Sequence, residues 1–284
     1  MARTDDDTWD ITECVGATAL SMAMARAGEA QAECPLFTDP YAQLFVDATA
    51  ARGWTPPFNE DMLAELMILD PHLAERIEAM SGYTASRTEY FDEFFVAAGA
   101  AGVRQGVILG AGLDTRAWRL PWVSDSVVYE IDQPKVLAFK GETLRGRGAE
   151  PAVAYVGVPI DLRQDWPKAL RDAGFDPATP TAWSAEGLLP YLAAGAQDVL
   201  FERIQELSAP GSRIAVEAFS AAFFDPDRLA RRKVQMQQVR EAARHAGATN
   251  LPTPKSCGSQ KSGPTSPTGC ARTAGRSPRS RRRT

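Results

Sequence analysis

The sequence predicts an α/β fold built around a doubly wound, mostly parallel β-sheet. After residue 105, short apolar runs rich in Val and Ile alternate with stretches of helical periodicity, a pattern typical of β-α-β units. The first of these runs breaks into the turn Gly110-Ala111-Gly112, where glycine lets the backbone approach a ligand closely. About 100 residues with helical patterning precede it, so we expect a helical cover on the sheet.

Five strands are expected, each followed by a turn or a helix, at 107–109, 127–131, 152–156, 180–184 and 212–219. Helices are expected at 134–144, 165–173, 197–208 and 228–246, and before the sheet at 10–30, after Asp39-Pro40 and at 86–100. Connections between parallel strands are right-handed, so the carboxyl ends of the strands meet at one edge of the sheet. We expect the ligand there.

An acid at the end of the second strand indicates a nucleoside-binding unit. Asp132 follows the glycine turn by about 20 residues, the spacing at which a carboxylate accepts hydrogen bonds from a ribose diol. Asp132 is the preferred ribose ligand. Two alternatives remain: Glu130, on the opposite face of the strand, takes that role, or Asp132 caps the helix that begins near Pro134.

Thr115 bears on the choice of cofactor. The dinucleotide fingerprint G-x-G-x-x-G needs Gly or Ala at this position, so that helix and strand pack closely around a pyrophosphate. Thr115 therefore favours a nucleoside with a zwitterionic arm and no phosphates, and S-adenosyl-L-methionine fits better than NAD(P). The helix N-terminus after Gly112 is then expected to hold a carboxylate. An NAD(P)-dependent oxidoreductase is the alternative.

Four further residues complete the expected site. Asp161 and Leu162 follow the third strand, where a carboxylate meets the exocyclic amine of adenine and an apolar side chain meets its ring. Glu186 follows the fourth strand, where cofactor and acceptor meet, and Arg87 begins a helix from which it can pair with the ligand's carboxylate. The alternatives are a helix cap for Asp161, an exposed loop acid for Glu186 and a surface arginine for Arg87.

The composition of the chain limits the binding partners and the cellular location that we expect. A net charge of −5 over 284 residues argues against a nucleic-acid-binding body. The four cysteines form no C-x-x-C pair and there are two histidines, so neither a disulfide framework nor a metal site is expected. The acidic N-terminus lacks the apolar core of a signal peptide, and no run reaches the ~18 apolar residues of a membrane span. We expect a cytoplasmic protein acting on a small-molecule acceptor.

Residues 255–284 differ from the rest of the chain. They carry eight basic and no acidic residues, so the first 254 residues have a net charge near −13. One interpretation is a disordered basic tail. The other is a shift of the reading frame near Pro254, because reading 255–275 one base earlier with allowed codons gives E-E-L-W-V-P-E-E-R-T-D-V-A-D-W-L-R-E-D-G-W. That peptide is acidic and helix-patterned. We expect the shift, with the last strands of the sheet missing.

Four motifs in order, L-G-A-G-L-D-T-R-A-W-R-L, Y-E-I-D-Q-P, D-L and A-E-G-L-L-P-Y-L, resemble a large bacterial family of S-adenosyl-L-methionine-dependent methyltransferases related to leucine carboxyl methyltransferases. The resemblance runs from about Thr8 to about Pro254. It implies a class I methyltransferase (Rossmann-like) fold, with a helical cover at 1–104, a cofactor-binding domain at 105–254 and the tail at 255–284. The cofactor-binding residues that it implies are Arg87, Gly110, Gly112, Asp132, Asp161, Leu162 and Glu186.

The resemblance also bears on chemistry. The methyl group of the cofactor is already activated, so an enzyme mainly aligns the acceptor and excludes water. We expect O-methylation of a carboxylate or hydroxyl, because such an acceptor needs no strong base and the sequence shows no evident one. The family continues past Pro254 with an E-E-L-W-like segment and closing strands, where this chain departs. A cofactor-binding product without activity is therefore a further alternative.

Overall fold

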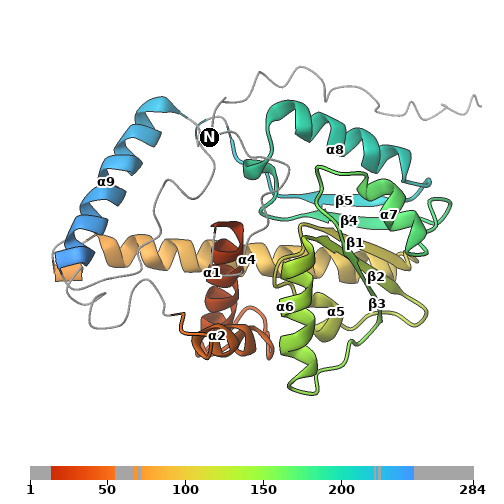
Figure 1. The fold of residues 1–284 in the computed structure, drawn as a ribbon, viewed down its shortest axis with the longest axis horizontal. Helices are drawn as coiled ribbons and strands as arrows, with labels where there is room; N and C mark the ends of the chain where they lie inside the picture. The colour runs from red at the N-terminus through yellow and green to blue at the C-terminus, as the bar shows by residue number, and fades with distance from the viewer. Residues whose placement is uncertain (1–13, 55–66, 69–71, 221, 223–224, 246–284) are drawn as a thin grey trace, which may run out of the picture.

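The sheet has the expected doubly wound topology. The computed structural model describes residues 14–54, 67–68, 72–220, 222 and 225–245, and five parallel strands lie in the order β3-β2-β1-β4-β5 (Figure 1). The strands are β1 (Gln105–Leu109), β2 (Val127–Asp132), β3 (Ala154–Pro159), β4 (Thr181–Ala185) and β5 (Arg213–Val216). The chain winds outward from β1 to β3 and then continues on the other side of β1. The strand order therefore reverses between β1 and β4.

Helices precede β1 and connect the strands. Those before the sheet are α1 (Cys14–Glu29), α2 (Ala42–Ala50) and α4 (Leu73–Ala100). Those after it begins are α5 (Arg116–Arg119), α6 (Pro134–Arg145), α7 (Trp166–Asp172), the 3-10 helix η1 (Leu189–Tyr191), α8 (Ala194–Glu206) and α9 (Pro226–His245). Among the residues that the structure describes, no helix has the length and apolar character needed to cross a membrane.

Side chains alternate between the two faces of the sheet, and each face has its own apolar core. Ile108 of β1 packs with Phe45 of α2, Phe95 of α4 and Phe139 of α6. The neighbouring residue Leu109 packs on the other face with residues of α7 and α8. Figure 1 shows the same arrangement, with α7 and α8 on one side of the sheet and α4, α5 and α6 on the other.

The structure differs from the expectations in three elements. Helix α4 begins at Leu73 rather than near 86, and its first turns are largely exposed. Strand β3 is shifted by two to three residues toward its carboxyl end. Strand β5 ends at Val216, before the expected end at 219. The expected helix start near residue 10 and the tail at 255–284 lie outside the described residues.

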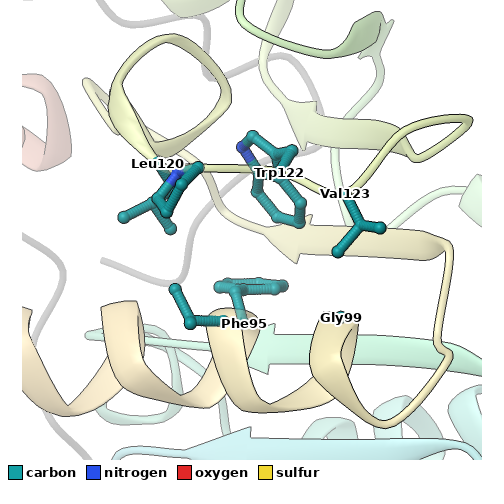
Figure 2. Close-up of a pocket in the computed structure, with 7 residues that line it drawn as sticks. Phe95, Gly99, Leu120, Trp122 and Val123 are labelled. Atoms are coloured by element: carbon teal, nitrogen blue, oxygen red, sulfur yellow. The ribbon is translucent and has the colours of Figure 1, made fainter.

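The amino end of β1 is closed by packing. Figure 2 shows Phe95 and Gly99 on α4 facing Trp122 and Val123 from the segment after α5. The rings of Phe95 and Trp122 lie 5.4 Å apart between centroids, and a Cβ on Gly99 would lie 3.1 Å from Val123 Cγ2. The hollow between them measures about 10 Å³. This hollow is therefore too small for a nucleoside.

Candidate functional site

The glycine turn lies at the carboxyl end of β1, where strand order reverses and open α/β sheets bind their ligands. Gly110 and Gly112 have φ values of +64° and +53°, which residues with side chains rarely adopt. A Cβ on Gly110 would lie 3.3 Å from Leu188 Cδ1, and one on Gly112 would lie 3.2 Å from Ala19 Cβ of α1. The turn therefore requires glycine, and α1 packs closely over it.

Asp132, the last residue of β2, ties this turn to its strand. Its Oδ2 accepts a hydrogen bond from Gly112 N at 2.6 Å and its Oδ1 accepts one from Gln133 N at 2.6 Å. Burial raises the pKa of Asp132, and the two amide bonds oppose that rise. Helix α6 has Gln133 as its N-cap and no side-chain cap bond, so the helix-cap alternative for Asp132 is wrong. Each carboxylate oxygen accepts two hydrogen bonds, which leaves capacity for a ribose diol.

The structure contradicts the expectation that a helix N-terminus after Gly112 holds a carboxylate. Helix α5 has 4 residues, and its N-cap Thr115 makes no side-chain cap bond. Such a short helix aligns few peptide dipoles. The Thr115 hydroxyl instead donates to Asp39 Oδ2 at 2.8 Å, and Gly112 N is already bonded to Asp132.

Glu130 is not the ribose ligand, and that alternative is wrong. Its side chain is 0% exposed and forms an ion pair with Lys140 of α6, which is also 0% exposed. Tyr155 OH donates to the same carboxylate at 2.9 Å. Burial raises the pKa of Glu130, although Lys140 and Tyr155 oppose the rise. The carboxylate is enclosed by protein on the face of β2 that α6 covers.

Asp161 follows β3 and lies beside Gln133, the residue that directly follows β2. Gln133 Nε2 donates to its Oδ2 at 3.2 Å, and Arg163 Nη2 pairs with the same oxygen at 2.8 Å. Helix α7 is capped by the carboxylate of Asp165, so the helix-cap alternative for Asp161 is wrong. Leu162 packs at the edge of the core that faces α7 and α8.

Arg87 and Glu186 meet in one ion-pair cluster. Arg87 Nε lies 2.8 Å from Glu186 Oε1, and the two side chains are 14% and 15% exposed, so neither is the surface residue that the alternatives proposed. Glu186 Oε2 also lies 2.7 Å from Arg116 Nη1, and Arg87 Nη1 lies 3.2 Å from Glu217 Oε2. Burial acts to lower the pKa of Arg87, but Glu186 and Glu217 raise it above its ordinary value. Arg87 therefore stays charged.

Two residues of this cluster, Arg116 and Glu217, were not predicted from the sequence. Arg116 is 3% exposed, and its guanidinium contacts Asp92, Asp114 and Glu186. Spacing alone does not reveal a buried arginine whose partners come from three separate segments. Glu217 directly follows β5, as Glu186 follows β4. The recurrence of an acid at each strand end was the signal that could have identified it.

A larger hollow lies elsewhere. It measures about 620 Å³ and runs along α4, between Glu89, Glu93 and Val96 on one side and Phe37 and Arg119 on the other. Its lining includes none of the seven residues predicted from the sequence. The chemical groups at the strand ends, rather than this hollow, therefore define the candidate site.

Comparison with known proteins identifies the family of this chain. The model of the leucine carboxyl methyltransferase family matches residues 19–205. A Mycobacterium avium (strain 104) protein named "Putative S-adenosyl-L-methionine-dependent methyltransferase" is 57% identical over 243 residues, which cover 86% of this chain and 77% of that protein. A Mycobacterium marinum protein of the same name is 55% identical over 245 residues, covering 86% and 78%. The crystal structure of a DUF574 family protein from Streptomyces avermitilis covers 82% of this chain and 79% of its own, with 18% identity and a TM-score of 0.42.

The matched region contains every residue of the candidate site up to Glu186. The resemblance seen in the sequence motifs is confirmed, and neither relative supports an NAD(P)-dependent oxidoreductase. The cofactor is S-adenosyl-L-methionine. The chain belongs to the leucine carboxyl methyltransferase family and is an S-adenosyl-L-methionine-dependent methyltransferase.

Proposed function

We propose that this chain O-methylates a small-molecule carboxylate. One observation carries the choice: within the described residues, the carboxylates at the strand ends are all engaged. Asp132 accepts from two backbone amides, and Glu186 and Glu217 pair with Arg87. A hydroxyl acceptor has to lose a proton to a base, whereas a carboxylate is already an anion at neutral pH. The name of the family model supports the same acceptor class.

We propose that each end of the cofactor meets a different part of the sheet edge. The chemistry of the side chains supports this assignment, since carboxylates suit hydroxyl and amine donors and guanidinium suits a carboxylate. Asp132 would bind the ribose, Asp161 and Leu162 the adenine, and Arg87 the carboxylate. Gly110 and Gly112 would face the methionine side, and Glu186 would line the site beside the acceptor. When bound, the cofactor supplies an activated methyl group.

We also propose the division into a helical cover at 1–104 and a cofactor-binding domain at 105–254. Helices α1, α2 and α4 all precede β1, which supports that boundary. A net charge of −5 supports a function without nucleic acid. A cytoplasmic location is part of the same proposal, and cell fractionation with antibody detection tests it.

The tail at 255–284 is proposed to be read out of frame. Its basic composition contrasts with the acidic body, and the shifted reading is stop-free and helix-patterned. The coding DNA tests this directly. Codons that cannot encode the shifted peptide would rule it out, and a frame-restored chain with higher stability and activity would support it.

The acceptor class is tested by the lability of the transferred methyl group. The full chain is incubated with S-adenosyl-L-methionine carrying a tritiated methyl group, first with mixed carboxylic acids and then with mixed phenols. Methyl esters release volatile methanol in mild base, whereas methyl ethers do not. We expect base-labile label from the acids. A parallel incubation with heat-denatured protein should give only background label. Base-stable label, or label from the phenols only, would overturn carboxylate methylation.

A further inference from the structure

Glu217 joins three elements at the edge of the site. The residue directly follows β5 and is 7% exposed. Its Oε2 accepts a hydrogen bond from Gly187 N at 2.6 Å, and its Oε1 accepts one from Tyr83 OH of α4. Both oxygens lie near Arg87 Nη1, at 3.3 and 3.2 Å. The carboxylate therefore links α4 to the segments that follow β4 and β5.

The donors around Glu217 hold its carboxylate in one orientation. Burial and the bond to Glu217 raise the pKa of Tyr83 to about 12, so the phenol is a donor at neutral pH. Gly187 has a φ of +64°, and a Cβ there would lie 3.7 Å from Glu217 Oε2 and 3.9 Å from Arg87 Nη1. With its oxygens held by a phenol, an amide and a guanidinium, Glu217 is oriented toward Arg87 rather than toward a ligand.

Two carboxylates hold two parts of the Arg87 guanidinium. Glu186 forms an ion pair at Nε without hydrogen-bond geometry, and Glu217 accepts hydrogen bonds from Nη1. Within the described part of the chain, Nη2 makes no hydrogen bond or ion pair. A planar guanidinium that is fixed at two nitrogens presents its third in a fixed direction. The side chain as a whole is 14% exposed.

We propose that Glu217 is a positioning residue of the cofactor site, which fixes Arg87 so that its remaining edge binds the carboxylate of the cofactor. This inference rests on the proposed function of Arg87. Glu217 would act only through the guanidinium, so it should matter for ligands that carry the amino-acid arm and not for ligands that lack it. Preorganisation of this kind raises affinity by removing the cost of ordering the side chain on binding.

The test compares two nucleosides by calorimetric titration of the full chain. S-adenosylhomocysteine carries the amino-acid arm, and 5′-methylthioadenosine lacks it. We expect Glu217→Gln to weaken S-adenosylhomocysteine binding by about tenfold, the size typical of one lost charge-assisted interaction, with 5′-methylthioadenosine affinity unchanged. Tyr83→Phe, which removes only the phenol donor, should weaken the same ligand less. Glu142→Gln, at a side chain that is 63% exposed, is the matched control and should change neither affinity.

A double-variant cycle distinguishes positioning from general support of the structure. If Glu217 acts through Arg87, then Arg87→Met with Glu217→Gln should bind S-adenosylhomocysteine no more weakly than Arg87→Met alone. Equal weakening of both nucleosides by Glu217→Gln would overturn the inference, as would additive losses in the cycle or no change at all. Wild-type protein that binds neither nucleoside would overturn the proposed site itself, and this inference with it.

Discussion

Arg116 shows how single residues set the electrostatics of the site. Its guanidinium is 3% exposed and lies among the carboxylates of Asp92, Asp114 and Glu186. A buried charge is tolerated only when it is paired and hydrogen-bonded. Burial acts to raise the pKa of Asp114, but the charge of Arg116 and its backbone N–H lower it to about 2. Asp114 is therefore ionised throughout the neutral range.

Asp114→Asn should lower the free energy of unfolding by about 2 kcal/mol at neutral pH, the equivalent of a pKa shift from 3.8 to about 2. Because the pKa is depressed in the folded state, this contribution is fully present above pH ~4 and is lost as the pH falls toward 2. Urea unfolding of both proteins between pH 7 and pH 3 measures it. Asp172→Asn, at a side chain that is 62% exposed, should have almost no effect. A gap between wild type and Asp114→Asn that stays constant down to pH 3 would contradict the account.

At the scale of elements, a buried ion pair joins β2 to α6. Glu130 and Lys140 are both 0% exposed, and the Lys140 ammonium lies 5.5 Å from the centre of the Trp118 ring. Removing one partner of such a pair leaves an uncompensated charge in the interior, whereas replacing both removes the problem. The pair therefore makes α6 docking depend on both residues.

Lys140→Met should destabilise the protein by about 3–5 kcal/mol, the range for breaking a buried pair. Glu130→Leu combined with Lys140→Met should recover a large part of that loss. Chemical denaturation of the three proteins measures both effects. A double variant as unstable as Lys140→Met alone would show that packing of α6, and not the unpaired charge, causes the loss.

The contribution of the contact between α1 and the glycine turn to stability can be measured separately from the cost of backbone strain. Gly112 and Gly148 both have positive φ, but a Cβ on Gly112 would meet Ala19 whereas a Cβ on Gly148 would meet nothing within 4 Å. An alanine with left-handed backbone costs about 1 kcal/mol in either place. Gly112→Ala should therefore lose more stability than Gly148→Ala and also weaken cofactor binding. Equal losses in denaturation would contradict close packing of α1 on the turn.

The strands could be predicted to within a few residues because each is a short apolar run bounded by glycine, proline or polar residues. Strand β3 was placed too early, because apolar residues continue from Ala152 to Pro159 and periodicity does not mark where pairing with β2 begins. The start of α4 was not predicted for a different reason. Its first turns are largely exposed, so no buried face marks where the helix begins.

At the scale of the whole molecule, the parallel sheet gathers acids from distant segments at one edge. Asp132 ends β2, and Asp161, Glu186 and Glu217 follow β3, β4 and β5. This edge follows from topology, so the sequence was sufficient to predict it. The partners were not predictable, because Arg87 reaches Glu186 and Glu217 only through the packing of α4 against the ends of β4 and β5.

Calorimetric titration of the full chain with S-adenosyl-L-methionine tests the central claim, that the carboxyl-end edge of the sheet binds the cofactor through Asp132. The wild-type protein should bind it at a single site, and should not bind NAD. Asp132→Asn should weaken binding by about tenfold or more, because an amide cannot accept hydrogen bonds at both of its ends. Glu142→Gln should bind as tightly as wild type. An unchanged affinity in a folded Asp132→Asn variant would contradict the account.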